Sequence, residues 1–362
     1  GIKGNFLLLK TSSGRDIEFF SEATRLESHA QDLPLLFNAL EIEIPDWLQR
    51  SKKLVYQGAI KGGIYDFLAN GKVEGDLIKG FLNLKTEQLN QKEEASYFGH
   101  VTLEKLGLGT LLAQNNLGQV HLDLDFNGRG YDLPTMNTSL QGRISRFDFR
   151  GASYRNMVVN GDIAEGLFDG LFTIDDPHFK MHFQGEAGFQ KDTFTYDFTA
   201  RLDSVDLHQL GLGEDSLAVF SSDLAIDIQA TDLEHWQGIV SMNRSRYSDS
   251  RRHYFFKDFL LDARGLDSIK DISLSSDVLD GSLKGAFTFS SLSNALQHSA
   301  NLFFNFQSDL KPLDTNTRFS FDFDFKNSQS LSQLLVPRLL IEPGTKLSGS
   351  YNQYLNEVIE SL

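Results

Sequence analysis

Strict alternation of apolar and polar residues is the feature that most constrains the fold of this 362-residue chain. Between Phe319 and Lys326, four phenylalanines alternate with four polar residues, so the two sets lie on opposite faces of an extended strand. The same pattern recurs over 120–126, 179–183, 194–202, 224–228 and 283–289. Period two indicates half-buried strands of an antiparallel sheet, because parallel sheets covered by helices show continuous apolar runs instead.

The composition also favours an all-β fold. The chain has 30 Phe and 30 Gly but only 4 Met and 7 Pro. Phenylalanine is enriched in strands, and glycine suits the tight turns that join them. Leucine-spaced segments at 32–36, 103–106, 206–210 and 331–335 predict a few short helices or turns beside the sheet.

The charge and the absence of cysteine exclude several function classes. The chain has 34 Lys and Arg against 49 Asp and Glu, a formal net charge of −15, which gives nucleic-acid binding no electrostatic support. With no cysteine it forms no disulfide, thiolate nucleophile or cysteine-ligated zinc site. No run of 18 apolar residues occurs, so the sequence predicts no membrane-spanning helix.

The sequence carries none of the common catalytic motifs. The sequence contains no G-x-S-x-G, H-E-x-x-H, Walker or EF-hand motif. His178 and His182 are expected on the solvated face of one strand, about 13 Å apart by strand rise, which is too far for one ion to bridge. Asp175 and Asp176 precede Pro177 and predict a turn. We therefore predict no metal, no cofactor and no enzyme activity.

A single basic cluster stands out in the sequence. Arg251, Arg252 and His253 follow Arg244 and Arg246 within ten positions. A solvated loop is the favoured interpretation of such a run. Contact with a lipid headgroup or a protein partner is the alternative.

The apolar face of the predicted strands admits two interpretations. It is either the core of a closed sandwich or barrel, or the lining of an open trough that carries hydrocarbon. Alternation alone does not separate the two, because both need strands that are apolar on one side.

Several motifs in the middle of the chain resemble a known family. LQGRISRFDFRGASYRN extends from Leu140 to Asn156, followed by VNG at 159–161, LFDGLFTIDDP at 167–177, FQG at 183–185 and VDLHQL at 205–210. The order of these motifs resembles the TamB branch of the AsmA-like envelope proteins. Four flanking segments are similar to other sequence motifs of that family: 45–48, 58–62, 271–277 and 281–285.

The resemblance implies a fold and a location. It predicts an elongated, curved, mostly antiparallel sheet that forms a taco-like open groove of degenerate repeats. Residues 1–100 are then one repeat with a short helical segment near 31–50, residues 101–328 are continuous groove repeats, and residues 329–362 begin a further, truncated repeat. It also predicts an internal piece of a longer protein that is anchored in the inner membrane and crosses the periplasm of a double-membraned bacterium.

The resemblance further implies a function without catalysis. The groove would hold phospholipid acyl chains between the inner and outer membranes, and an outer-membrane barrel of the TamA or BamA class would be a partner, although the domain expected to contact it is not recognised in this sequence. Alternatives are a scaffold that assembles outer-membrane or secreted β-proteins through its strand edges, and a closed β-sandwich binding module. The predicted lipid-groove lining consists of the apolar members of the alternating strands: Val120, Leu122, Leu124, Phe126, Phe168, Phe172, Ile174, Phe179, Met181, Phe183, Phe194, Tyr196, Phe198, Leu224, Ile226, Ile228, Leu283, Phe287, Phe289, Leu302, Phe304, Phe306, Phe319, Phe321, Phe323 and Phe325.

Overall fold

The computed structural model describes most of the chain as two units. The described residues are 2–4, 7–10, 17–29, 50–63, 65–188, 193–212, 214–232, 234–265, 269–292, 295, 317–326, 341–352 and 357–361. The first unit comprises Gly1–Gln184 and Gln209–Leu212, and the second comprises Gly185–His208 and Gly213–Leu362. The predicted helical segment near 31–50 lies outside the described residues except for Arg50, and so does the leucine-spaced segment 331–335.

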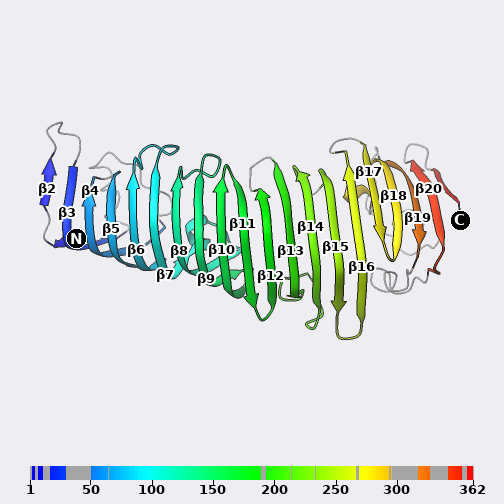
Figure 1. Ribbon diagram of the computed structural model, residues 1–362, viewed down its shortest axis with the longest axis horizontal. Coiled ribbons are helices and arrows are strands. Elements are labelled where there is room, and N and C mark those ends of the chain that lie inside the picture. Colours follow the sequence, from blue (N-terminus) through cyan, green and yellow to red (C-terminus); the bar gives the residue numbers. More distant parts are fainter. Residues whose placement is uncertain are drawn as a thin grey trace. The chain divides into compact units, whose positions relative to one another are not determined.

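The first unit is built almost entirely of strands, which Figure 1 labels along the chain. They are β1 (Ile2–Gly4), β2 (Leu7–Lys10), β3 (Ile17–His29), β4 (Lys53–Gly62), β5 (Phe67–Gly75), β6 (Ile78–Glu87), β7 (Ser96–Gly107), β8 (Leu117–Arg129), β9 (Asn137–Phe149), β10 (Ala152–Ala164), β11 (Leu167–Asp176) and the first part of β12 (Phe179–Gly188). A short helix, α3 (Leu108–Leu112), joins β7 to β8.

The second unit is also built almost entirely of strands. It holds the end of β12 and then β13 (Phe194–Asp206), β14 (Val219–Ala230), β15 (Trp236–Ser248), β16 (His253–Arg264), β17 (Lys270–Ser276), β18 (Leu279–Ala286), β19 (Arg318–Phe325), β20 (Lys346–Asn352) and β21 (Glu357–Ser361). A helical turn at 289–292 follows β18.

Antiparallel pairing of sequence neighbours produces an open sheet in each unit. In the first unit β3 to β11 pair in order, with β1 and β2 both paired to β3. In the second unit β13 to β21 pair in order. Among the described residues no pairing closes either sheet on itself. The prediction of an all-β, antiparallel, open fold with few short helices is confirmed, and the closed alternative is wrong for this part of the chain.

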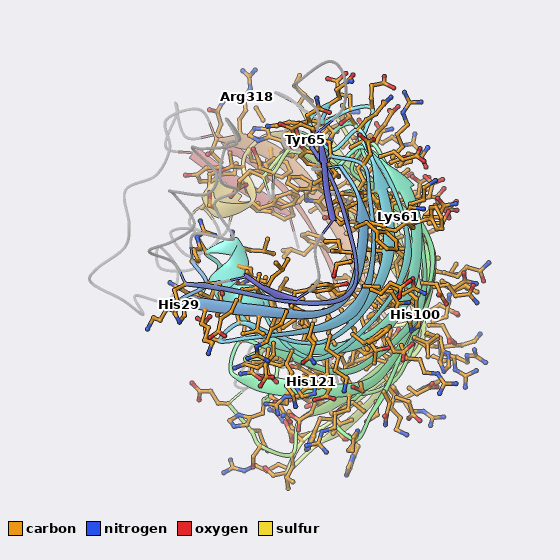
Figure 2. The ribbon with its side chains drawn as sticks, turned by 90° about the vertical axis from the view of Figure 1, so that its left-hand side faces the viewer. His29, Lys61, Tyr65, His100, His121 and Arg318 are labelled. Carbon is orange, nitrogen blue, oxygen red and sulfur yellow. The ribbon has the colours of Figure 1, made fainter. Side chains whose placement is uncertain are left out.

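The sheet of the first unit is curved across its strands. In Figure 2 the strands arc from the turn at Tyr65 to the end of β3 at His29, with Lys61 and His100 on the outside of the arc. We call the side toward which the strands bend the inner face and the opposite side the outer face. Because neighbouring residues alternate between faces, the apolar rows of these strands lie on the inner face.

Bulges are one cause of the curvature. A bulge places an extra residue in one strand of a pair, which bends that strand and increases its twist. In the first unit the register shifts between β3 and β4, β6 and β7, β7 and β8, and β8 and β9. The shifts lie at Ser21/Thr24, Lys79/Gly80, Leu103/Leu106 and His121/Leu122, respectively. The predicted helix or turn at 103–106 is therefore wrong, because these residues belong to β7 and the helix begins at Leu108.

Facing glycines permit close approach on the inner face. Gly58 of β4 pairs with Gly71 of β5, and a Cβ on Gly58 would lie only 2.4 Å from the Cα of Gly71. The Tyr56 ring lies across this gap, with its Cζ 2.9 Å from where a Cβ on Gly71 would be, and its hydroxyl donates to the Ala59 carbonyl at 2.7 Å. An aromatic ring over a cross-strand glycine restores apolar cover that the glycine lacks.

We expect Gly71→Val to destabilise the first unit by about 2–4 kcal/mol, because the new side chain meets the backbone of β4 and the Tyr56 ring. Asn70→Val, on the exposed outer face next to it, is the control and should change the free energy of unfolding by less than about 0.5 kcal/mol. Urea unfolding followed by circular dichroism measures both. Equal effects from the two variants would contradict the close-approach argument.

Candidate functional site

In the first unit, the register of the strands brings predicted lining residues together with apolar neighbours. Leu122 of β8 lies opposite Leu103 of β7 and Ile144 of β9, and Leu124 lies opposite Val101. Farther along the unit, the rings of Phe168 and Phe183 lie 6.2 Å apart, and Ile174 belongs to a buried cluster with Tyr154 and Met157. The inner face of this unit is thus lined by apolar side chains of several strands.

The second unit pairs the predicted lining residues of β13 and β14 directly. Tyr196 lies opposite Ile228, and Phe198 lies opposite Ile226. Ile226 in turn lies opposite Val240 of β15. We call the side that carries these residues the apolar face of the second unit.

Phenylalanines of β19 continue the apolar face of the second unit. Phe321 lies opposite Leu283 of β18. Its ring stacks on that of Phe323 with centroids 5.7 Å apart, and Phe319 stacks on Tyr351 of β20 at 5.4 Å. Neighbouring rings give a broad apolar surface, in which the Tyr351 hydroxyl is the one side-chain polar atom of these four rings.

The predicted lining residues are incompletely covered. Val120, Ile174, Leu283, Phe287 and Phe319 are buried, with exposed fractions of 4–9%. Every other described member of the set is half-buried, and none is exposed. The core of a two-layer sandwich would bury such side chains almost fully, so these faces present apolar surface that the chain itself covers only in part.

Five of the predicted lining residues do not belong to any described strand. Phe287 and Phe289 were expected in a strand, but β18 ends at Ala286 and both residues lie in the segment that follows it. Phe289 opens the helical turn, because Thr288 and Ser291 cap each other: the Ser291 N–H donates to Thr288 Oγ1 at 3.0 Å and the Thr288 N–H donates to Ser291 Oγ at 2.9 Å. Leu302, Phe304 and Phe306 lie outside the described residues.

Other apolar residues share these faces although the sequence patterns did not single them out. Glycines and alanines interrupt the alternation in β4–β7, and residues opposite the predicted set in β9, β10, β15 and β17 come from shorter or bulged patterns. Counting Gly and Ala as apolar in a period-two pattern would have identified most of them. They are Tyr56, Ile60, Val73, Leu82, Leu84, Val101, Leu103, Ile144, Met157, Val159, Val240, Met242, Ile272 and Tyr351.

Short connecting segments cover part of each apolar face. In the first unit, Leu210 packs on the cluster of Tyr154, Met157 and Ile174. In the second unit, Phe289 stacks on Trp236 with centroids 5.6 Å apart. These contacts shield portions of the faces that the strands alone leave open.

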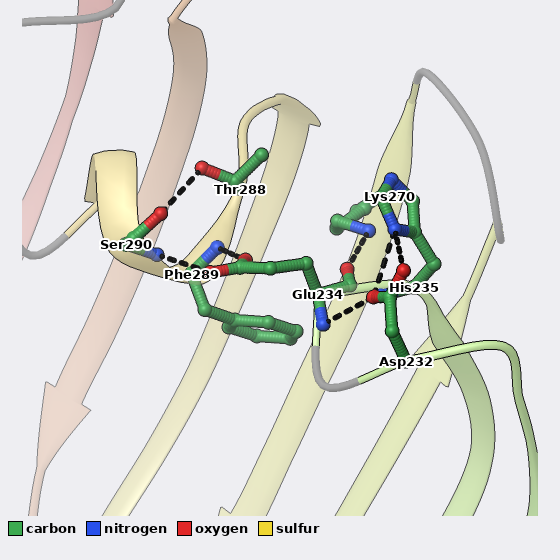
Figure 3. A network of polar contacts seen from close by, with 7 residues as sticks. All are labelled: Asp232, Glu234, His235, Lys270, Thr288, Phe289 and Ser290. Atoms are coloured by element: carbon green, nitrogen blue, oxygen red, sulfur yellow. Dashed lines mark hydrogen bonds and ion pairs between the residues drawn. The ribbon is translucent and has the colours of Figure 1, made fainter.

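Polar contacts fix the helical turn in the second unit, as Figure 3 shows. The Glu234 carboxylate accepts the backbone N–H of Phe289 at 2.5 Å and that of Ser290 at 3.2 Å. Lys270, only 3% exposed, donates to the Glu234 carbonyl at 2.8 Å, and its Nζ lies 5.6 Å from the centre of the Phe289 ring. A buried ammonium is tolerated here because a carbonyl and an aromatic face both interact with it.

The basic cluster is largely engaged within the chain. Arg252 donates to Asp249 through Nε at 3.0 Å and Nη2 at 2.8 Å, and Arg244 pairs with Asp223. Arg246 lies over the Phe255 ring, 5.8 Å from its centroid. The predicted solvated loop holds only for Arg251 and Arg252, because Arg244 and Arg246 lie in β15 and His253 begins β16.

Asp249 organises the turn between β15 and β16. Its carboxylate accepts the N–H groups of Arg251 and Arg252 at 2.9 and 2.8 Å and the Tyr247 hydroxyl at 3.1 Å. The Arg251 N–H, and then the Arg252 guanidinium, hold the pKa of Asp249 down from 3.8 to about 2. The charged form of this carboxylate therefore favours the folded turn.

The depressed pKa of Asp249 sets a pH window. Its stabilisation is fully present above its unfolded pKa near 3.8 and is lost as the pH falls through its folded pKa of about 2. We therefore expect Asp249→Asn to speed hydrogen exchange at the amides of 250–252 at neutral pH, with the difference from the parent protein shrinking between pH 4 and pH 2. A difference that stays constant across that window would contradict this assignment.

A polar pocket of about 750 Å³ lies over β7, β8 and β9, where two register shifts disturb the ladder. Asp123, Asp125 and Arg143 are among its lining residues. Beside it, His100 contacts Asp125 at 2.9 Å through Nδ1 and Thr102 at 3.1 Å through Nε2. These contacts form a hydrogen-bonded surface network.

Candidate metal ligands do not gather into a cluster in the described part of the chain. No group of three or more His, Cys, Asp or Glu side chains there could hold a metal ion. His178 lies in the turn before β12 rather than in the strand with His182, and both are exposed. No described helix has the length and apolar character needed to cross a bilayer.

Comparison with known proteins gives no match. No protein-family model, no curated protein and no solved structure matches this chain.

Proposed function

We propose that the protein is a non-enzymatic conduit that holds phospholipid acyl chains against its apolar faces, in the periplasm between the inner and outer membranes. The observation that supports this most strongly is the incomplete burial of the lining. Seventeen of the predicted lining residues are half-buried on open sheets, so the strands offer apolar surface to something other than themselves. The motif resemblance to the TamB branch supplies the location and the anchoring in the inner membrane.

The free-energy cost of exposing an acyl chain to water supports hydrocarbon as the bound group. An acyl chain of about 16 CH₂ groups costs roughly 13 kcal/mol to expose to water, at about 0.8 kcal/mol for each CH₂. A protein that moves such chains between membranes needs an apolar surface that continues from strand to strand. The paired rows Tyr196–Ile228, Phe198–Ile226 and Leu283–Phe321 provide that continuity within the second unit.

The competing function is a scaffold that binds outer-membrane or secreted β-proteins by pairing with its strand edges. An outer-membrane barrel of the TamA or BamA class would be a partner in either case. The two functions differ in the surface they use, because a scaffold needs backbone edges and a conduit needs the apolar face. Native mass spectrometry of the purified protein separates them: bound phospholipid favours the conduit, and a protein free of lipid favours the scaffold.

We expect Phe321→Asp to abolish lipid binding in the second unit while leaving the fold intact, with a loss of stability of about 1–3 kcal/mol. Phe321 is half-buried, so the new carboxylate can reach water, but an unpaired charge in the path of an acyl chain is costly. The measurement is photo-crosslinking to labelled phospholipid from position 321, combined with thermal unfolding.

Two comparisons make this test specific. Phe321→Leu keeps an apolar side chain and should retain lipid, and a crosslinker at Asp322, which is exposed on the opposite face, should capture none. The proposal would be contradicted by crosslinks that arise equally from 321 and 322. It would also be contradicted by full lipid binding of a folded Phe321→Asp protein.

A further inference from the structure

The outer face of β4–β7 in the first unit carries an unusual combination of residues. The strand register places Lys61, Leu68, Lys85 and Phe98 in one row across the four strands. A parallel row holds Gln57, Lys72, Phe81 and Thr102, and the row between them holds Ala59, Asn70, Asn83 and His100. We call Lys61, Leu68, Lys72, Phe81, Lys85 and Phe98 the basic patch.

The three rows contain no carboxylate. The chain as a whole has 49 Asp and Glu, most of which must lie on polar faces such as this one. Immediately beyond β7 the outer face becomes acidic, because Asp123 and Asp125 of β8 continue two of the three rows. The basic patch is therefore a local departure from the acidic character of the protein.

The apolar members of the basic patch are strongly exposed. The exposed fractions of Leu68, Phe81 and Phe98 are 47%, 38% and 52%. In Figure 2, Lys61 and His100 mark this region on the outside of the arc, where side chains point away from the sheet. From strand spacing and rise, the three rows cover about 14 Å by 14 Å.

The lysines of the basic patch are available to an external anion. Within the described part of the chain, neither Lys61 nor Lys72 forms an ion pair. Lys85 lies over the Phe98 ring, 5.7 Å from its centroid, and pairs with Glu87 at 2.5 Å on the same strand. Its charge is thus partly balanced by Glu87, and that of Lys72 is partly balanced by the longer-range attraction of Glu104, whereas no carboxylate pairs with Lys61 in the described part of the chain.

Ile239, one of the exposed apolar residues of the second unit, has a different setting. Ile239 of β15 is 42% exposed, but it lies between Asp227 of β14 and Asp262 of β16. Carboxylates on both sides would repel an anionic surface. Exposed apolar surface at Ile239 is thus flanked by acids, whereas in the basic patch Leu68, Phe81 and Phe98 each lie opposite a lysine.

We propose that the basic patch docks the first unit on the surface of a bilayer that contains anionic phospholipid. Lysines attract anionic headgroups, and protruding Leu and Phe side chains enter the boundary between headgroups and acyl chains. Each lysine near such a surface contributes about fivefold to the partition coefficient. The inference goes beyond the conduit function, because it uses the outer face and does not depend on what occupies the inner one.

Flotation of the protein with vesicles tests the proposal. We expect binding to phosphatidylcholine vesicles that contain phosphatidylglycerol, little binding to pure phosphatidylcholine, and weakening at high salt. The double variant Lys61→Gln/Lys72→Gln should bind about 25-fold more weakly. Phe98→Ser should bind roughly tenfold more weakly, through lost insertion of its ring.

Matched controls separate the basic patch from net charge and from the apolar faces. Lys92→Gln/Lys180→Gln removes the same charge from exposed lysines that are paired with Asp132 and Asp175, and Leu171→Ser removes another exposed apolar side chain, 46% exposed on β11. Both should bind vesicles like the parent protein. Phe321→Asp should also keep vesicle binding, so loss of the conduit and loss of docking are distinguishable.

Three results would overturn the proposal. The first is equal binding to vesicles with and without phosphatidylglycerol. The second is an equal loss in the patch variants and in the Lys92/Lys180 control. The third is absence of vesicle binding together with altered self-association of the patch variants in sedimentation, which would make the basic patch a protein–protein interface instead.

Discussion

The apolar face of an antiparallel sheet has to leave water, and the two units achieve this without a second sheet among their described strands. In the first unit the sheet bends toward that face, so its side chains approach one another. Bending requires bulges, which change the direction of a strand, and facing glycines such as Gly58 and Gly71, which let backbones come close. Short segments such as the turn containing Leu210 then cover part of what remains. The lining stays half-buried because the bulges, the facing glycines and the short segments together do not cover it as a second sheet would.

The strands and their faces could be predicted from the sequence because period two is a local property. Residues 319–325 alternate without a break, and β19 occupies Arg318–Phe325 with its phenylalanines on the apolar face. The pairing of Leu283 with Phe321 follows once each strand is assigned its apolar side, because neighbouring strands must place those sides together. Curvature could not be predicted in this way. It depends on which bulges and glycines become neighbours across strands, and that is decided by register rather than by any one segment.

Two predictions were wrong for identifiable physical reasons: the helix or turn at 103–106, and the strand that was expected to include Phe287 and Phe289. Leu103 and Leu106 are three apart, which resembles helical spacing, but a bulge between them in β7 places both opposite residues of β8. An extra residue changes the parity of a strand, so a bulged strand can imitate a helix turn in sequence. Phe287 and Phe289 alternate like strand residues, yet the reciprocal cap between Thr288 and Ser291 starts a helical turn. The T-x-x-S spacing was the available signal, and it competed with a stronger alternation.

The inner and outer faces of the first unit are linked by the same register. Leu68 and Lys72 of the basic patch alternate along β5 with Ala69, Gly71 and Val73 of the inner face. A slip of one residue would move lysine inward and the small apolar residues outward, so one register determines both surfaces. The acidic outer face elsewhere opposes face-to-face stacking of open sheets through like charge, which an exposed sheet needs. Where that acidity is absent, over β4–β7, the repulsion is also absent, and the exposed Phe and Lys side chains make that region the part of the outer face best suited to contact an anionic surface.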